Sequence, residues 1–408
     1  ASWPPNTEVA IGAKAWRADV TREFREAFDG RARRDELPAA VAADLAIAYA
    51  QLVTEGDAGG GWRVRSLADS STRMSFYVVM RDGRATLIGG SWLSGSLGRE
   101  VRAAVARGEL DRARQWLRWY VEDTGSRSTF ARSWLGRHEA DLVTASAELL
   151  DLAGALASIA IEPDQAAPVL ARCAGLTAPD DLGDCHRAAG EAYARAGDTG
   201  AALREAQAWV QAQPDRAPAL VRLAIELVRG GNTADATALL EAALAKQPAD
   251  VELLLARAQL AQLTAGTATP WFARALAART PGILNNAAWA RLRGDPRAPE
   301  LRAWVEEALK ASAEPTTALR NTAAAVFAEA DLPDEAWQQQ RHVFKRARGG
   351  DADWYVMGRI AEGYGLRDDA IAWYRKTSAT APRVLSPSGW EFAQRRLKAL
   401  GAAPAAKP

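Results

Sequence analysis

Few residues of this sequence have the types and spacing that enzymes use. Histidine occurs only at His138, His186 and His342, too far apart for a zinc-ligand motif or a local nucleophile–histidine pair. No phosphate-binding or dinucleotide-binding glycine loop is present. The glycine and serine segments 89–91 and 94–96 lack the neighbouring base or lysine that such loops need, so we interpret them as structural. The sequence therefore predicts no catalytic residue, no metal site and no cofactor.

Three aspartates, Asp180, Asp181 and Asp184, form an acidic cluster at the predicted start of a helix near Cys185. A calcium loop would need alternating oxygen ligands around a glycine turn, and this segment lacks that pattern. Carboxylates are expected in the first turn of a helix without any ligand, because unpaired backbone NH groups and the helix dipole favour negative charge there. We therefore interpret the cluster as helix capping.

The two cysteines, Cys173 and Cys185, fall within one short stretch. We expect Cys173 on the last turn of one helix and Cys185 on the first turn of the next, where antiparallel packing brings their α-carbons within bridging reach. A disulfide here indicates an oxidising compartment, so we favour an extracytoplasmic bacterial location, periplasmic or secreted. The opening Ala1-Ser2-Trp3, without methionine, suits a mature or a cropped chain. The alternative is a pair of buried reduced thiols in a cytoplasmic protein.

The composition is that of an ordinary globular chain, with 408 residues, 48% hydrophobic and 25% charged. A formal net charge of +1 creates no long-range field toward nucleic acid or acidic lipid, so nucleic acid is not an expected partner. No run of eighteen apolar residues is present, and no transmembrane segment is predicted.

A 34-residue period organises the second half of the chain. Pro214 and Pro248 are 34 residues apart, as are Gly197 and Gly231, and each pair takes the same place in a helix–turn–helix pattern. The glycine ends the turn between the helices, and the proline stops the second helix. The pattern recurs over residues 220–248, 251–281, 284–315, 319–344 and 358–382, followed by an amphipathic helix around Trp390 that is expected to cap the stack.

These spacings make residues 183–382 resemble a tetratricopeptide repeat (TPR) array. The expected fold class is mainly α, a right-handed α-α superhelix (a TPR-like solenoid) preceded by a small α+β domain. Residues 93–182 are expected to hold degenerate helical hairpins, one from Leu97 to Tyr120 and two helices over 143–174 broken at Glu162-Pro163. Residues 383–408 are predicted as a C-terminal capping helix and a disordered tail.

Residues 1–92 are predicted as a small α+β module. The helical spacing from Trp16 to Phe28 and the run Val41–Val53 indicate two helices. Alternation over Trp62–Leu67 and two apolar runs around Asp82-Gly83 indicate a β-hairpin within about three strands. Because so few elements are only marginally stable alone, we expect the module to pack against the first helical hairpin.

The resemblance implies a concave groove lined by the first helix of each repeat. By position in the repeat, the groove candidates are Arg187, Glu191, Arg195, Val221, Ile225, Arg229, Asn285, Trp289, Asn321, Tyr355 and Arg359. Asparagine can bind a peptide backbone, aromatic residues can anchor a partner, and arginine can pair with carboxylates. For each residue the alternative is a structural role, in the core or on a solvated face. No lysine-rich carboxylate clamp is visible, so recognition of a free carboxyl terminus is not expected.

Three functions remain open at this point. The favoured one is a non-catalytic protein–protein interaction scaffold, not an enzyme, which binds a protein or peptide in the groove. The second is the regulatory or substrate-recruiting region of a larger enzyme. The third is small-ligand binding by the N-terminal α+β module. The sequence predicts neither the identity of the partner nor the oligomeric state.

Overall fold

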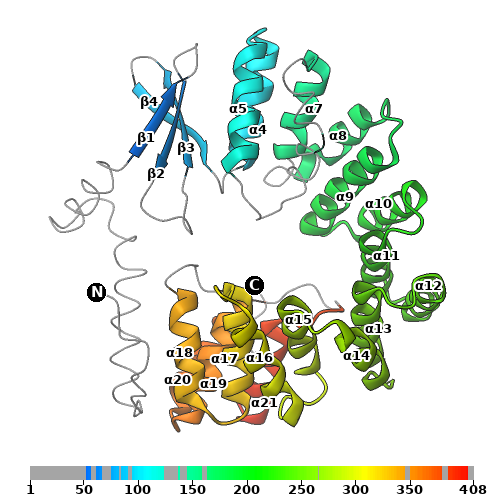
Figure 1. The fold of residues 1–408 in the computed structure, drawn as a ribbon, viewed down its shortest axis with the longest axis vertical. Helices are drawn as coiled ribbons and strands as arrows, with labels where there is room; N and C mark the ends of the chain where they lie inside the picture. Colours follow the sequence, from blue (N-terminus) through cyan, green and yellow to red (C-terminus); the bar gives the residue numbers. More distant parts are fainter. Residues whose placement is uncertain are drawn as a thin grey trace, which may run out of the picture. The chain divides into compact units, whose positions relative to one another are not determined.

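The structure is a computed structural model (Figure 1), and it describes residues 52–56, 61–66, 75–81, 84–90, 94–123, 137, 145–158, 163–264, 266–344, 350–378 and 385–402. These residues form two compact units, one ending at Glu226 and the other beginning at Leu227. Each unit is described by itself. The division falls within one helix of the repeat region, and the domain boundaries expected near 92, 182 and 382 stay predictions.

The first unit begins with a four-stranded antiparallel sheet of order β1-β2-β3-β4, made of β1 (Leu52–Gly56), β2 (Gly61–Ser66), β3 (Ser75–Arg81) and β4 (Arg84–Gly90). β3 and β4 pair from Arg81 and Arg84 outward, as the predicted hairpin requires, with a register shift between Tyr77 and Val78. The sheet has one strand more than expected. The predicted helix Val41–Val53 is wrong at its end, because its last two residues pair within β1.

The sheet packs against the first helical hairpin of the unit. Tyr77 of β3 is fully buried, and its ring stacks on that of Trp119 of α5 (Leu110–Asp123) with the centroids 6.4 Å apart. β4 lies against α4 (Ser94–Ala106). The two N-terminal helices that would complete the α+β module lie outside the described residues, so the module as a whole stays a prediction.

Helices continue the first unit: α7 (Ala147–Ser158), the 3-10 turn η3 (Pro163–Gln165), α8 (Ala166–Cys173), α9 (Pro179–Ala196), α10 (Thr199–Ala212) and α11 (Ala217–Arg229). The hairpin predicted from Leu97 to Tyr120 is present as α4 and α5, and its turn contains Gly108 with a φ of 77°. α4 also packs closely on α7, since a Cβ at Gly154 would lie 2.8 Å from the carbonyl oxygen of Gly98.

The second unit continues the helical pairs, with α12 (Thr233–Lys246), α13 (Val251–Leu263), α14 (Thr269–Ala275), the 3-10 turn η4 (Leu276–Ala278), α15 (Pro281–Arg291), α16 (Pro299–Ala311), α17 (Thr317–Glu329), α18 (Pro333–Phe344), α19 (Asp351–Gly363), α20 (Arg367–Tyr374) and α21 (Gly389–Ala399). From α9 to α20, the helices come in the pairs that the 34-residue pattern predicts. The described repeat region is therefore a TPR-like α-α solenoid.

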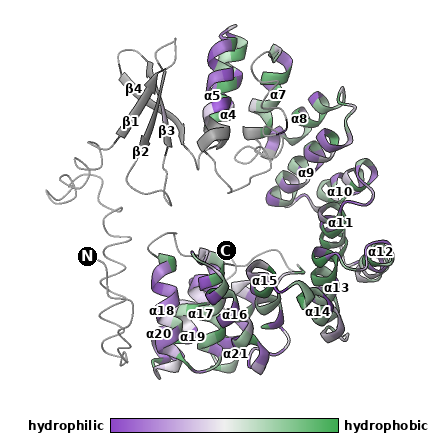
Figure 2. Cartoon of the chain, viewed as in Figure 1, coloured by the Kyte–Doolittle hydropathy of each residue, from purple (hydrophilic) through white to green (hydrophobic). Residues whose placement is uncertain are grey.

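Local sequence explains the hairpins. Gly197 ends α9 in the left-handed conformation (φ 82°), which glycine adopts without strain, and Asp198 then caps α10 by accepting a hydrogen bond from the Ala201 NH at 2.9 Å. Gly231 and Gly365 have the same positive φ at the equivalent turns. Figure 2 shows both hydrophobic and hydrophilic residues on helices such as α9 and α18, as packing of one face requires. Among the described residues, no helix combines the length and apolarity needed to cross a membrane.

The disulfide predicted between Cys173 and Cys185 is present and joins α8 to α9. The two cysteines are 12 residues apart, their α-carbons are 6.4 Å apart, and both side chains are buried. Cys173 is the last residue of α8, as expected. Cys185 lies in the second turn of α9 rather than the first, because α9 already begins at Pro179.

Breaking this bond should destabilise the first unit. A closed loop of this size is worth about 3 kcal/mol in the chain-entropy model. We expect Cys173→Ser/Cys185→Ser to lower the free energy of unfolding by about that amount, measured by urea denaturation of unreduced chains. Reductant should lower the stability of the wild type and leave the variant unchanged. Two reactive thiols in the denatured, unreduced wild type would contradict the bond.

Gly358 provides a test of the close packing of α19 on α20. A Cβ at this position would overlap the buried ring of Tyr374. We expect Gly358→Ala to cost about 1–3 kcal/mol through overpacking, as measured by calorimetry. The matched control is Gly282→Ala in α15, where a Cβ meets nothing within 4 Å. The control should be neutral or stabilising by up to about 1 kcal/mol, because alanine favours the helix. Equal effects at the two sites would contradict this packing.

Candidate functional site

The groove candidates of the first unit lie on two adjacent helices. Arg187, Glu191 and Arg195 are on α9, and Val221 and Ile225 are on α11. The two helices are joined where Arg222 donates a hydrogen bond to the carbonyl oxygen of Gly190 at 3.2 Å. Arg195 is exposed and the other four are partly exposed. We call these five residues the α9–α11 surface.

Charges on this part of α9 and α11 are held by local contacts. Arg187 lies 3.7 Å from Glu191, and its guanidinium is 6.0 Å from the ring centroid of Trp209. On α11, Arg222 pairs with the buried carboxylate of Glu226 at 2.8 Å. The remaining candidate on α11, Arg229, is partly exposed. The α9–α11 surface thus combines aliphatic groups with charged groups, of which Arg187 and Glu191 contact each other.

In the acidic cluster, Asp180 and Asp181 lie in the first turn of α9, as predicted, but they do not cap the helix. The cap of α9 is Ala178, which makes no side-chain capping bond. The buried Asp181 and Asp184 instead accept hydrogen bonds from Arg137, the first at 3.0 Å, while Asp180 accepts from Gln213. Burial raises the pKa of Asp184, although the positive charge of Arg137 opposes this rise. The cluster therefore ties the start of α9 to other segments.

The candidates on α15 are only partly exposed. Trp289 donates a hydrogen bond from its indole NH to the carbonyl oxygen of Pro387 at 2.8 Å. Its ring also meets that of Phe392 edge-on, with the centroids 5.4 Å apart. Asn285 donates to the side chain of Asn286 at 3.1 Å. The segment around α21 thus covers part of the surface that was predicted to receive a partner.

Asn321 is buried in a polar cluster that links three helices. Its amide donates to Asp353 Oδ1 at 2.7 Å and to Gln340 Oε1 at 3.3 Å, and Gln340 donates to the same Asp353 oxygen at 2.8 Å. The other oxygen of Asp353 accepts from the Gly350 NH at 2.7 Å. Burial raises the pKa of Asp353 in spite of these bonds. Asn321 therefore joins α17, α18 and α19 rather than lining an open groove.

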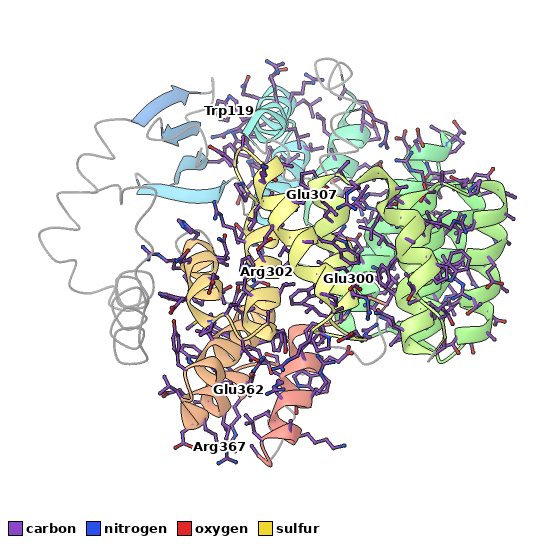
Figure 3. The ribbon with its side chains drawn as sticks, turned by 60° about the horizontal axis from the view of Figure 1, so that its bottom comes forward. Trp119, Glu300, Arg302, Glu307, Glu362 and Arg367 are labelled. Atoms are coloured by element: carbon purple, nitrogen blue, oxygen red, sulfur yellow. A yellow bond between two sulfur atoms is a disulfide. The ribbon has the colours of Figure 1, made fainter. Side chains whose placement is uncertain are left out.

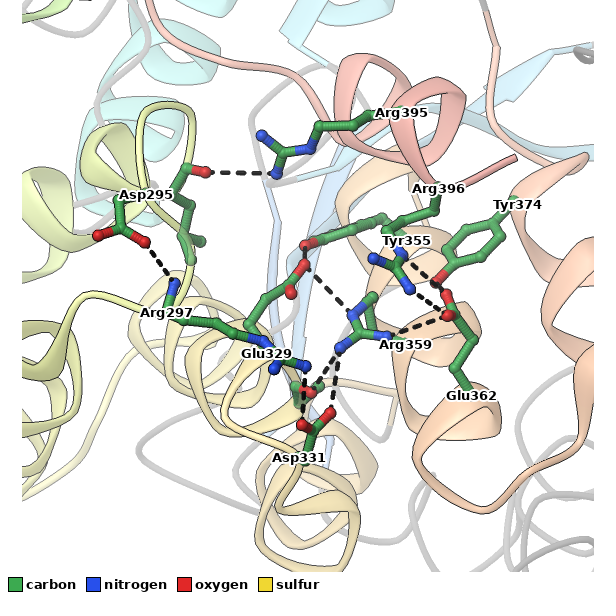
Figure 4. Close-up of polar contacts among 12 residues, drawn as sticks. Asp295, Arg297, Glu329, Asp331, Tyr355, Arg359, Glu362, Tyr374, Arg395 and Arg396 are labelled. Atoms are coloured by element: carbon green, nitrogen blue, oxygen red, sulfur yellow. Dashed lines mark hydrogen bonds and ion pairs between the residues drawn. The ribbon is translucent and has the colours of Figure 1, made fainter. Parts of the chain in front are cut away.

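Tyr355 and Arg359 form the centre of a buried ionic network (Figure 4). The Tyr355 hydroxyl donates to Glu329, and the guanidinium of Arg359 lies 3.2 Å from Glu329, 3.6 Å from Asp331 and 3.3 Å from Glu362. Side-chain exposure is 3% for both Arg359 and Glu329. Burial and the charge of Glu329 raise the pKa of Tyr355 well above its ordinary value, so the phenol remains a neutral donor.

Glu362 connects this network to α21. Its carboxylate accepts hydrogen bonds from Arg396 and from the hydroxyl of Tyr374, and Figure 3 shows it where α19 meets α21. Burial alone would raise the pKa of Glu362. The hydrogen bonds from Arg396 and Tyr374, together with the charge of Arg359, outweigh that effect and lower it. Glu362 therefore stays ionised and binds α21 to the last repeat.

Asn321, Tyr355 and Arg359 are therefore covered in this structure. Their repeat positions are those expected for a groove, but all three are buried by side chains of α17–α21 and by the network. The residues that sequence reasoning missed are Arg293, Glu391 and Phe392, which contact one another or Trp289 across this surface. The amphipathic pattern around Trp390 predicted a terminal helix. It did not predict that this helix contacts α15. Within the described ranges, no group of three His, Cys, Asp or Glu side chains is arranged to hold a metal ion.

No protein-family model matches the sequence, and no curated protein does. Similar solved structures include one from a functional characterisation of Pseudomonas aeruginosa PilF, which is 16% identical, with 48% of this chain and 91% of that chain covered and a TM-score of 0.35. A tetratricopeptide repeat protein of Parabacteroides merdae is 14% identical, with 61% and 92% covered and a TM-score of 0.34. The TPR domain of P58(IPK) is 15% identical, with 76% and 80% covered and a TM-score of 0.26. Likenesses at this level say nothing of partner or activity.

The buried network can be tested with two arginines that contact the same carboxylate, Asp331. Arg359→Met leaves Glu329 buried without its cation, and we expect a loss of about 3–5 kcal/mol in the free energy of unfolding. The control Arg297→Met removes an exposed pair with Asp331 (63% and 58% exposed) and should cost less than about 1 kcal/mol. Calorimetry of both variants measures the difference. Similar losses for the two would show that Arg359 is not a structural centre.

Proposed function

We propose that this chain is a non-catalytic scaffold that binds a protein or peptide along the first helices of its TPR-like repeats, with the repeats wound as a right-handed superhelix. One observation supports the proposal most directly. The candidates on α9 and α11 remain at the surface, whereas the equivalent residues on α17 and α19 are buried. Side chains that contribute little to packing and still occupy groove positions are suited to contact a partner.

The chemistry of the α9–α11 surface indicates the kind of segment it fits. Val221 and Ile225 offer aliphatic contact, and Arg187 and Arg195 offer guanidinium groups that bind carboxylates. Glu191 adds an acceptor for a backbone NH or a basic side chain. A peptide that carries an apolar residue next to an acidic one would satisfy these groups together. Arg187 already contacts Glu191 and the ring of Trp209, so it loses less conformational freedom on binding than an unconstrained arginine would.

The disulfide supports a location for this scaffold. Disulfides persist in oxidising compartments and are rare in the reducing cytoplasm. Because Cys173 and Cys185 are joined in the structure, the proposal includes an extracytoplasmic site of action in a bacterium, periplasmic or secreted. Partner capture from the native cell fraction therefore reports on the compartment as well as on the partner.

Site-specific photo-crosslinking tests the scaffold. A benzoylphenylalanine at Ile225 should crosslink the partner in native cells, while the same group at the exposed Gln207 of α10 should not. Arg187→Glu should reduce the crosslink at position 225 at least about tenfold, equivalent to about 1.4 kcal/mol of binding free energy. Circular dichroism of each variant verifies that the helices are intact. Equal crosslinking from positions 207 and 225 would contradict the proposed surface.

A further inference from the structure

The C-terminal helix covers the first helix of an earlier repeat, and this placement defines a second surface. We propose that the surface made by Trp289, Arg293, Tyr355 and Glu362 is a binding site for an amphipathic helix, with α21 as its displaceable resident. We call these four residues the α15–α19 surface. The partner that fits is a helix with the pattern of α21, an acidic residue followed by an aromatic one and by two arginines. The inference deepens the scaffold function and rests on it.

The aromatic anchor of α21 is Phe392. Its ring centroid lies 5.4 Å from that of Trp289 on α15 and 5.1 Å from that of Tyr355 on α19, and the side chain is almost fully buried. The indole NH of Trp289 also holds the carbonyl oxygen of Pro387. A buried aromatic residue between two others contributes far more to docking than a rim contact does. α21 thus occupies the place that a helix has in a helix-in-groove complex.

The charges on both sides are complementary and directional. Arg293 donates from Nε and Nη2 to the two oxygens of Glu391, each at 2.9 Å, and from Nη1 to the Leu385 carbonyl oxygen at 2.6 Å. The Arg293 side chain is only 8% exposed. A bidentate pair of this kind fixes orientation as well as binding energy. It therefore selects a helix that presents a carboxylate next to the aromatic anchor.

Two arginines of α21 contact the C-terminal ends of other helices. Arg395 donates to the carbonyl oxygens of Leu292 and Arg293, at 3.3 and 3.1 Å, just beyond the last residue of α15. Carbonyls at a helix C-terminus lack partners within the helix and carry partial negative charge, so they favour a cation. Arg396 pairs with Glu362 of α19. The two arginines thus contact helices of two different repeats.

The start of α21 has one close contact that fixes its position. A Cβ at Gly389 would overlap the backbone carbonyl of Asp351, the first residue of α19. Only glycine allows the two helix starts to approach in this way. The aromatic anchor, the carboxylate and the two arginines are therefore aligned with their partners in one register.

The short length of α21 favours its replacement by another helix. It has 11 residues, and an isolated helix of that length is marginal in water. Because α21 belongs to the same chain as the surface it covers, it is always present at a high effective concentration. A helix in trans must compete with this local concentration. Weakening α21 in cis should therefore strengthen binding in trans without any change in the surface itself.

The test uses the full chain and a fluorescent peptide with the sequence of residues 385–402. We expect the peptide to bind the Glu391→Ala/Phe392→Ala chain at least about tenfold more tightly than the wild-type chain, measured by fluorescence anisotropy. A peptide carrying Phe392→Ala is the control and should bind neither chain. Adding Arg293→Glu to the double variant should abolish binding of the unchanged peptide and restore it for a peptide carrying Glu391→Arg. Equal affinity of the peptide for the wild-type and double-variant chains would overturn the proposal.

A second measurement needs no variant, so it holds if the double variant fails to fold. Hydrogen exchange of the wild-type chain, followed by mass spectrometry, should show amides of residues 393–399 exchanging at least about tenfold faster than those of α19, because a replaceable helix opens by itself. Equal protection of α19 and α21 would show a permanent cap and overturn the inference. If α21 proves to be a permanent cap, the crosslink from position 225 is still expected. If the scaffold function is wrong, that crosslink is lost while the peptide still binds the double variant.

Discussion

The second unit depends on how the buried charge of Arg359 is compensated. A guanidinium that is almost fully buried is tolerated only when carboxylates compensate its lost hydration, and here Glu329, Asp331 and Glu362 do so from two neighbouring repeats. Glu362 in turn holds Arg396 of α21. One buried cation therefore couples α17, α19 and α21, and changes in any of these helices are felt by the others.

In the first unit, neighbouring helices are joined by other kinds of contact. A disulfide fixes α8 to α9, and glycines at the crossing of α4 and α7 replace bulky contacts with backbone proximity. Because these devices hold α9 without burying all of its first-helix positions, side chains such as Arg187 and Glu191 remain at the surface. The first-helix side chains of α17 and α19 in the second unit are thus used for packing. Those of the α9–α11 surface, where the proposed binding function lies, remain accessible.

Sequence periodicity predicted the elements that are determined by residues close together in the chain. The offset between Gly197 and Gly231 located the helix pairs, and the turn chemistry at Asp-Gly located the β3–β4 hairpin. Contacts between distant segments were not predictable in this way. The partner of Asp184 is Arg137, 47 residues away, and Pro387, which accepts the hydrogen bond of Trp289, lies 98 residues from it. Repeat position alone could not show that Tyr355 and Arg359 are buried, because the helix that covers them follows the array.

Gly389, at the start of α21, also limits which sequences this chain can adopt in evolution. A one-turn slip of α21 would bring a residue with a side chain against the backbone of α19, so misaligned docking is blocked by sterics rather than by weaker attraction. An added methyl group at position 389 changes none of the charged or aromatic residues of α21. It would still prevent α21 from docking, because the methyl group would overlap the backbone of α19. Under the proposed exchange of α21, a single substitution there would be enough to leave the α15–α19 surface uncovered.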